Sequence, residues 1–96
     1  MTPEGLLREK RQEILSIAAS HGARNVRVFG SAARGEAGAD SDLDFLVDFE
    51  PGRSLLDQVA LTLDLQELLG RKADVVTEGA LYWLLRRRIL KEARAL

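Results

Sequence analysis

The sequence predicts an α+β domain in which a short, mixed, three-stranded sheet packs with about four helices. Two segments with alternating apolar and polar residues, at 25–30 and 42–49, and a short third segment at 72–77 predict the strands. Helical patterns precede, separate and follow them, so the expected order is helix, strand, helical turn, strand, helix, strand, helix. The chain contains no repeat and no linker, and we expect residues 1–96 to form a single domain.

The first helix should cover residues 3–22, where Pro3 suits a first turn, apolar residues recur at helical spacing and Gly22 can end the helix. The next segment, NVRVFG, alternates between two sides and should be a strand that stops at Gly30. Residues 32–40, AARGEAGAD, are short and rich in glycine, so we expect a brief helical turn followed by a loop.

The segment DLDFLVDF gives the clearest strand pattern of the chain. It places Leu43, Phe45, Val47 and Phe49 on one face and Asp42, Asp44, Leu46 and Asp48 on the other. Ser54 and Asp57 then form a capping pattern for a helix over 54–69 that Gly70 terminates. KADVVT predicts the third strand, and residues 80–94 predict the last helix.

Strand directions follow from the connections. The second strand, its helix and the third strand form a βαβ unit, so these strands should be parallel with a right-handed crossover. The first two strands have a compact connection and should be antiparallel. The end of the first strand, with Gly30 and Ser31, then lies beside Asp42 and Asp44, and Asp74 falls at the same edge.

Composition excludes several classes of protein. The chain is 46% hydrophobic and 30% charged, which is typical of a soluble domain, and no apolar run approaches the roughly 18 residues of a membrane span. The first residues are too charged for a signal peptide. The chain has no cysteine, which excludes thiolate metal sites and fits a cytoplasmic protein, and a single histidine argues against His-rich metal sites.

Charge is distributed unevenly along a chain whose net charge is only −1. The segment 36–50 has no Lys or Arg and carries the acids Glu36, Asp40, Asp42, Asp44, Asp48 and Glu50. The last predicted helix carries Arg86, Arg87, Arg88, Lys91 and Arg94 against one acid, Glu92. We therefore expect an acidic end of the molecule and a basic strip on a helix elsewhere.

The acidic end has the chemistry of a metal and phosphate site. Alternate residues of a strand lie about 7 Å apart, where two carboxylates repel by roughly 2 kcal/mol, and no nearby Lys or Arg in the sequence offsets this repulsion. Mg²⁺ relieves such crowding and is typically held by carboxylates and substrate phosphates. Opposite the acids, backbone N–H groups after Gly30, the Ser31 hydroxyl and Arg34 could bind a triphosphate.

With these residues the sequence resembles the minimal nucleotidyltransferase (MNT) family of the DNA polymerase β-like superfamily. The matching motif is Gly30-Ser31, ten intervening residues, and Asp42-Leu43-Asp44-Phe45. Residues 34–37, Ser41 and the third acid, Asp74, also match. The resemblance is firm from about residue 26 to residue 77, whereas the terminal helices agree in kind only.

The resemblance implies the polymerase β-like fold and assigns roles to these residues. Asp42 and Asp44 would bind two Mg²⁺ ions, and Asp74 would bind one of them and help to activate the attacking hydroxyl. Gly30 and Ser31 would contact the triphosphate. Many family members of this size are antitoxins paired with a HEPN-type helical toxin, so the implied reaction is transfer of AMP from ATP to a hydroxyl, typically of tyrosine, on that toxin.

Structural interpretations compete at several positions. Asp48 and Glu50 lie farther along the strand and are expected to face solvent rather than the site. Arg34 could form a surface ion pair with Glu36 or Asp40 instead of binding phosphate. Ser31 could merely cap the turn, and His21 is expected to be a C-terminal helix cap or an exposed residue.

The last helix has a stripe at every fourth position that should dock on the sheet, formed by Leu81, Leu85, Ile89 and Ala93. Tyr82, Trp83 and Leu90 fall off this stripe and could complete the core or form an interface beside the arginines. The helix over 54–69 is apolar on more than one side, which agrees with a protein partner or with self-association. The acidic cleft argues against nucleic-acid binding.

Two functions remain open from the sequence, and nucleic-acid binding by Arg86–Arg88 is a weaker third alternative. The first is a Mg²⁺-dependent nucleotidyltransferase that modifies a partner protein, and the second is a non-catalytic antitoxin that neutralises its partner by contact. The presence of Asp42, Asp44 and Asp74 favours the enzyme, because a purely steric module would not need all three acids.

Overall fold

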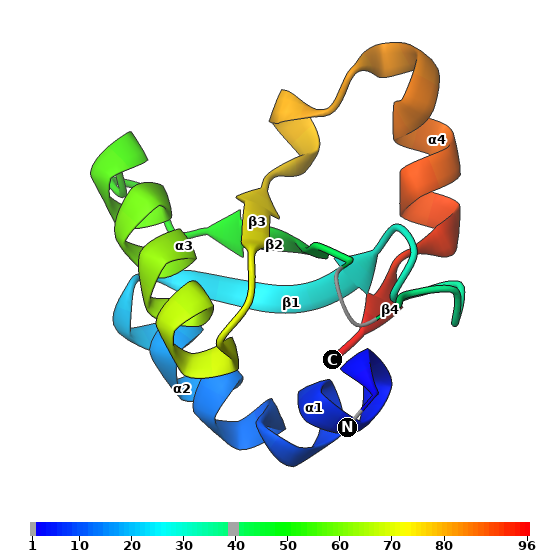
Figure 1. The fold of residues 1–96 in the computed structure, drawn as a ribbon. Helices are drawn as coiled ribbons and strands as arrows, with labels where there is room; N and C mark the ends of the chain where they lie inside the picture. The colour runs from blue at the N-terminus through cyan, green and yellow to red at the C-terminus, as the bar shows by residue number, and fades with distance from the viewer. Residues whose placement is uncertain (1, 39–40) are drawn as a thin grey trace.

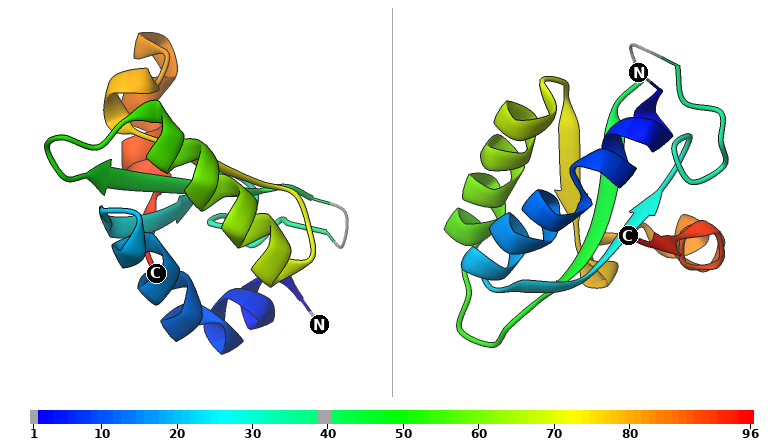
Figure 2. Two further views of the ribbon diagram at one scale, coloured as in Figure 1. Left: turned by 90° about the vertical axis from the view of Figure 1, so that its left-hand side faces the viewer. Right: turned by 90° about the horizontal axis from the view of Figure 1, so that it is seen from below.

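The computed structural model describes residues 2–38 and 41–96 and confirms the α+β architecture. The strands lie in the order β3-β2-β1-β4, with α1, α2 and α3 on one side of the sheet and η1 and α4 on the other (Figures 1 and 2). The elements are α1 (Pro3–Glu9), α2 (Arg11–Ser20), β1 (Ala23–Phe29), β2 (Leu43–Phe49), α3 (Leu55–Leu69), β3 (Ala73–Val76), the 3₁₀ helix η1 (Glu78–Ala80), α4 (Trp83–Glu92) and β4 (Arg94–Ala95).

The first predicted helix is two helices, because the chain leaves helical geometry at Lys10 (φ −95°, ψ 6°). Thr2 caps α1 by accepting a hydrogen bond from the Gly5 N–H at 3.0 Å. The change of direction between α1 and α2 allows both Leu7 and Ile14 to reach the core, where each is buried.

The strand directions are as predicted: β1 and β2 are antiparallel, and β2 and β3 are parallel. β1 begins at Ala23, two residues earlier than expected, and contains an irregularity between Arg24 and Arg27 where Asn25 has a φ of 52°. Such a bulge adds twist to an antiparallel pair. It leaves Val26 and Val28 both facing the core.

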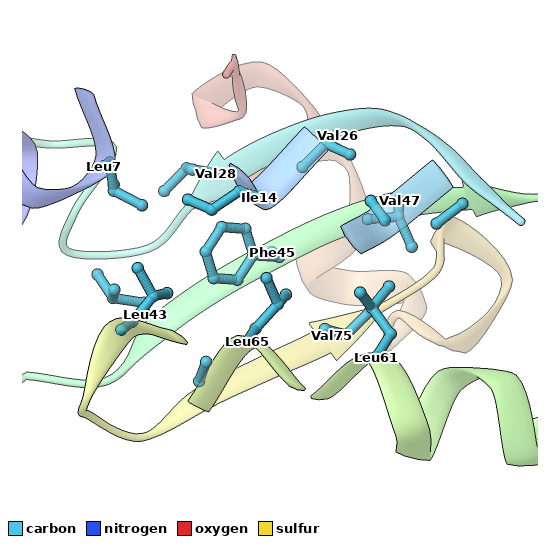
Figure 3. Close-up of a cluster of buried hydrophobic side chains, with 14 of the residues drawn as sticks. Leu7, Ile14, Val26, Val28, Leu43, Phe45, Val47, Leu61, Leu65 and Val75 are labelled. Carbon is cyan, nitrogen blue, oxygen red and sulfur yellow. The ribbon is translucent and has the colours of Figure 1, made fainter. Parts of the chain in front are cut away.

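The core lies between the sheet and the helices α1, α2 and α3. The apolar face of β2 contributes Leu43, Phe45 and Val47, which pack with Ile14 and with residues of α3 (Figure 3). α3 begins with the predicted capping box. The Ser54 side chain accepts a hydrogen bond from a backbone N–H of the first turn, and the Asp57 side chain accepts one from the Ser54 N–H. It ends at Gly70 in the left-handed conformation.

The last predicted helix is shorter than expected, and the sequence prediction that it docks on the sheet is wrong. α4 starts at Trp83 after η1 and ends at Glu92, and none of its residues is buried. Leu85, which the four-residue stripe placed against the sheet, is 47% exposed. Leu81, Ile89 and Ala93 of the stripe are half-buried and α4 contacts β1, so the stripe faces the sheet but is not buried against it.

A fourth strand was missed because the helical pattern was extended to residue 94. Ala93 adopts an extended conformation (φ −60°, ψ 135°), and β4 then pairs antiparallel with the outer edge of β1. The Leu96 N–H donates to the Val26 carbonyl at 3.0 Å, which continues this pairing. Within the described part of the chain, no helix has both the length and the apolarity needed to cross a membrane.

Candidate active site

Three predicted aspartates lie near one another on the face of the sheet opposite the core. Asp44 in β2 pairs in register with Asp74 in β3 and with Phe29 at the end of β1. Asp42 directly precedes β2 and shares the side of Asp44 because strand residues alternate. The parallel pairing of β2 with β3 therefore brings an acid from each strand to the same position.

The electrostatic environment of Asp44 reflects its acidic neighbours. Partial burial raises the pKa of the Asp44 carboxyl, and the negative charges of Asp74 and then Asp42 raise it further. Arg34 acts in the opposite direction. In the part of the chain that the structure describes, the Asp44 side chain makes no hydrogen bond or ion pair that would compensate its charge.

Gly30 closes the site from the β1 side. It adopts a φ of +73°, which favours glycine, and a Cβ atom there would lie 2.6 Å from Asp44 Oδ2. The backbone conformation therefore favours glycine, and a Cβ atom there would also force the Asp44 carboxylate to shift. The contact places the start of the turn that follows β1 directly against the Asp44 carboxylate.

Residues 30–35 form a single compact turn, as expected. The carbonyls of Gly30, Ser31 and Ala32 accept hydrogen bonds from residues 34, 36 and 35 at 3.2, 2.9 and 3.3 Å. Across residues 2–38 and 41–96, the N–H groups of Ser31, Ala32 and Ala33 have no hydrogen-bond acceptor. Free N–H groups at the start of a helical turn are suited to an anion.

Arg34 lies between the acids and α4. Its Nε donates to Glu36 Oε2 at 2.9 Å and its Nη1 donates to Glu92 Oε2 at 3.1 Å. The ion pair with Glu36 is one of the two alternatives to phosphate binding, and the other, Asp40, lies outside the described residues. Arg34 nevertheless remains close enough to Asp44 to lower the pKa of its carboxyl.

Two basic residues beside the site were missed. Lys72 Nζ lies 3.8 Å from Asp42 Oδ2, so the expectation that no Lys or Arg offsets the acids is wrong for Asp42. The parallel register could have revealed it, because pairing Asp44 with Asp74 places Asp42 beside Lys72. Arg71 Nη2 donates to the carbonyls of Gly38 (2.9 Å) and Ser41 (2.6 Å). No side-chain pattern signals contacts of this kind, since the acceptors are backbone groups.

Other acidic and titratable residues have structural partners away from the site. Asp48 accepts hydrogen bonds from Arg27 Nη2 at 3.1 Å and from Asn25 Nδ2 at 2.9 Å. Glu50 is exposed and pairs with Arg53. His21 is the C-cap of α2, as predicted, and its Nε2 lies 2.6 Å from Asp64 Oδ2.

The donor chemistry of the site suits Mg²⁺, which prefers carboxylate oxygens. Asp44 has two neighbouring carboxylates and no compensating cation of its own, which is the electrostatic situation that a divalent ion relieves. The side chains are spread along the strand ends, and in the described residues no three acidic or His side chains converge tightly enough to enclose one ion. The acids therefore fit an open site that shares its ions with a substrate rather than a closed structural metal centre.

A separate cavity of about 360 Å³ lies behind the turn, between α1, β4 and Arg34. None of the three aspartates lines it. The cavity is therefore distinct from the aspartate cluster, although Arg34 lines it.

Comparison with known proteins agrees with the geometry. The nucleotidyltransferase domain family matches residues 7–96. A "Putative protein adenylyltransferase" of Methanocaldococcus jannaschii is 44% identical over 87 residues, which cover 91% of this chain and 94% of the relative. The protein adenylyltransferase MntA of Thermococcus cleftensis is 42% identical over 89 residues, covering 84% of this chain and 90% of MntA.

Two solved structures share the fold. One, described as "Structure of putative minimal nucleotidyltransferase", is 53% identical, covers 100% of this chain and 97% of the other, and has a TM-score of 0.88. A toxin–antitoxin crystal structure with AMP-PNP has a TM-score of 0.74 at 17% identity, covering 88% of this chain and 69% of the other, and shows a common fold alone. The chain therefore belongs to the nucleotidyltransferase domain family, and the resemblance to minimal nucleotidyltransferases that its Gly-Ser and Asp-Leu-Asp-Phe motifs indicate is confirmed.

Proposed function

We propose that residues 1–96 form a single-domain, Mg²⁺-dependent enzyme that transfers AMP from ATP to a hydroxyl of a partner protein in the cytoplasm. The observation that carries this proposal is the juxtaposition of Asp44 with Asp74 on one side and with the Gly30 turn on the other. In such a site the carboxylates can bind the metal ions of a metal-bound nucleoside triphosphate, and the free N–H groups can bind its phosphates. The names of two relatives as protein adenylyltransferases support AMP as the transferred group.

Each site residue has a proposed role. The N–H groups after Gly30 and the Ser31 hydroxyl donate to triphosphate oxygens, and Arg34 neutralises part of their charge. Asp42, Asp44 and Asp74 would hold two Mg²⁺ ions, which supply charge neutralisation to the carboxylates and the phosphates. Asp74 also helps to activate the acceptor hydroxyl, since it lies at the edge of the site on β3.

The reaction balances without any other reagent. The acceptor oxygen forms a bond to the α-phosphorus of ATP, the bond from that phosphorus to the bridging oxygen breaks, and pyrophosphate leaves. The hydroxyl proton passes to a carboxylate of the site and then to solvent. The chain's own contribution is to align the triphosphate and to keep a carboxylate beside the attacking oxygen.

The proposed acceptor is a HEPN-type helical toxin, with this chain as its antitoxin. The shared fold with a toxin–antitoxin structure makes this the first partner to test. A non-catalytic antitoxin is the second candidate function. The exposed apolar residues of α3 and α4, among them Leu56 and Trp83, favour it, because contact alone could neutralise a partner.

Labelled ATP tests the proposal directly. The purified chain is mixed with Mg²⁺, the product of the adjacent gene and ATP labelled at either the α- or the γ-phosphate. We expect label on the partner only from the α-position, and none after chelation of Mg²⁺. A stable complex that never acquires label would reject the enzyme and leave the contact-only antitoxin.

A further inference from the structure

Helix α4 lies on the side of the sheet opposite α1, α2 and α3, and little of the protein packs against it. It has no buried residue, and it lies apart from the other long helices, across the sheet from α2 and α3 (Figures 1 and 2). We use the name α4 patch for the exposed apolar residues in and next to this helix, which are Tyr82, Trp83, Leu84, Leu85 and Leu90. The rings of Tyr82 and Trp83 lie 6.2 Å apart, so these residues form a contiguous aromatic surface.

The α4 patch sits in a strongly basic setting. Between Trp83 and Glu92 the helix has three arginines, one lysine and one acid, a net charge of +3. The whole chain carries −1, so the remaining residues sum to −4. A surface complementary to α4 is therefore apolar in its centre and carries carboxylates around it.

The C-terminal end of α4 is joined to the candidate active site. Glu92 accepts hydrogen bonds from Arg88 Nε through Oε1 and from Arg34 Nη1 through Oε2, both at 3.1 Å. Arg34 in turn acts on the Asp44 carboxyl. A molecule that lies along α4, which is about 15 Å long, therefore reaches the edge of the acid cluster.

From these observations we propose that the α4 patch is the docking surface of the protein acceptor, and that the acceptor presents an apolar surface flanked by carboxylates. This inference rests on the proposed function in one respect, namely that the acceptor is a protein. Trp, Tyr and Arg are the residue types that most often carry binding energy at protein interfaces, and α4 concentrates all three. Docking there would hold the acceptor hydroxyl beside the site by binding energy remote from the reacting atoms.

A second copy of the chain is the main competing occupant. The exposed face of α3 is apolar as well, with Leu56, Val59 and Leu63, and α3 carries three acids and no basic residue. However, α3 and α4 lie on opposite sides of the sheet (Figure 2). A contact of α3 with α4 between copies is head-to-tail, and so builds a ring or an open chain of several copies, whereas one acceptor can cover α4 in a single step.

Trp83 provides the reporter for a test, because it is the only tryptophan of the chain and is 71% exposed. The probe is the purified product of the adjacent gene. We expect it to shift the Trp83 emission to shorter wavelength and to protect the ring from acrylamide, while dilution of the chain alone changes neither. An emission that changes with the concentration of the chain alone would assign the patch to a second copy and overturn the proposal.

Two leucines of nearly equal exposure give a matched pair of variants. Leu84 in α4 is 58% exposed and Leu63 in α3 is 59% exposed, so Leu84→Asp and Leu63→Asp are equally tolerable to the fold. We expect Leu84→Asp to weaken binding of the probe about tenfold or more, and Leu63→Asp to change it less than about twofold. Arg87→Glu should weaken binding as well and reduce its dependence on salt.

Transfer kinetics separate a docking role from a catalytic one. Leu84→Asp should raise the KM for the acceptor and leave kcat within about twofold of the unsubstituted chain. Transfer that is unaffected by Leu84→Asp would overturn the docking proposal while leaving the proposed function intact. Binding through α4 without any transfer would keep the docking proposal and reject the proposed function. A probe that does not bind the unsubstituted chain would reject both proposals. Equal binding of a nucleic acid to the patch, lost with added salt, would also overturn a protein acceptor.

Discussion

Strand β2 carries two aspartates on the same face, four residues apart, and their environments are opposite. Asp48 is held by Arg27 and Asn25, and Arg27 is only 13% exposed and also pairs with Glu78 at 3.0 Å. Asp44 faces Asp74 and Asp42 instead, and burial and these charges raise the pKa of its carboxyl. One end of the strand therefore uses its acid to join secondary-structure elements, whereas the other end keeps an acid whose charge destabilises the metal-free fold.

The difference teaches how to separate functional from structural acids in this chain. An acid with a structural role is expected to pair with a cation, as Asp48 pairs with Arg27. A cluster left without full compensation has a cost in stability, which is expected where a ligand supplies the missing charge. Five substitutions, grouped in four predictions, test this contrast.

The largest effect should come from replacing the two acids of β2 separately. Asp44→Asn should lower the rate of label transfer from ATP by roughly a hundredfold or more, because a ligand of the proposed metal ions is lost. Asp48→Asn should leave the rate within about twofold, since its partners lie outside the site. Initial rates at saturating ATP and acceptor measure both. Equal losses for the two variants would remove the distinction between the two ends of the strand.

The fold and much of the site could be predicted because they depend on local patterns. The alternation of Leu43, Phe45 and Val47 defines which face of β2 is buried, and the capping residues of α3 define its ends. The acid cluster then follows from strand direction alone. β4 could not be predicted in this way, since two residues become a strand only through pairing with β1.

Long-range ion pairs were equally hidden. Arg34 meets Glu92 across 58 positions of sequence, and this contact depends on where α4 comes to rest. The docking of α4 was mispredicted for the same reason, because its four-residue stripe indicates a helix and one face but does not say whether anything covers that face. Lys72 was predictable in principle, and the register that pairs Asp44 with Asp74 would have placed it beside Asp42.

Glycine positions provide the second test of the site end. Gly30→Ala should destabilise the fold by about 2–3 kcal/mol, because alanine is strained at positive φ and its Cβ would meet the Asp44 carboxylate. Gly52 has a φ of +89° with no atom within 4 Å of a Cβ, so Gly52→Ala should cost only the backbone strain, about 1 kcal/mol. Urea unfolding of both variants measures the difference. If the two costs are equal, Gly30 has no special relation to Asp44.

At the structural end of β2, the prediction concerns Arg27. Arg27→Met keeps most of the side-chain volume but leaves Asp48 and Glu78 without their common cation, and we expect a loss of about 1–2 kcal/mol. The carboxylates are partly exposed, so water compensates them in part and the loss stays below that of a fully buried pair. Thermal and urea unfolding measure it. An unchanged stability would show that this network is a surface feature without energetic weight.

The smallest effect is also the one that distinguishes the two ends most directly. Without metal, Asp44→Asn should stabilise the fold by no more than about 0.5–1 kcal/mol, because it removes a partly buried charge that Asp74 and Asp42 repel, while solvent screens much of this repulsion at a half-exposed group. Asp48→Asn should do the opposite, since it weakens the pairing with Arg27. Urea unfolding in the presence of a chelator measures both variants, and added Mg²⁺ should stabilise the unsubstituted chain but not Asp44→Asn. A loss of stability in Asp44→Asn would mean that the carboxylate is a structural group, and the contrast between the two aspartates would then disappear.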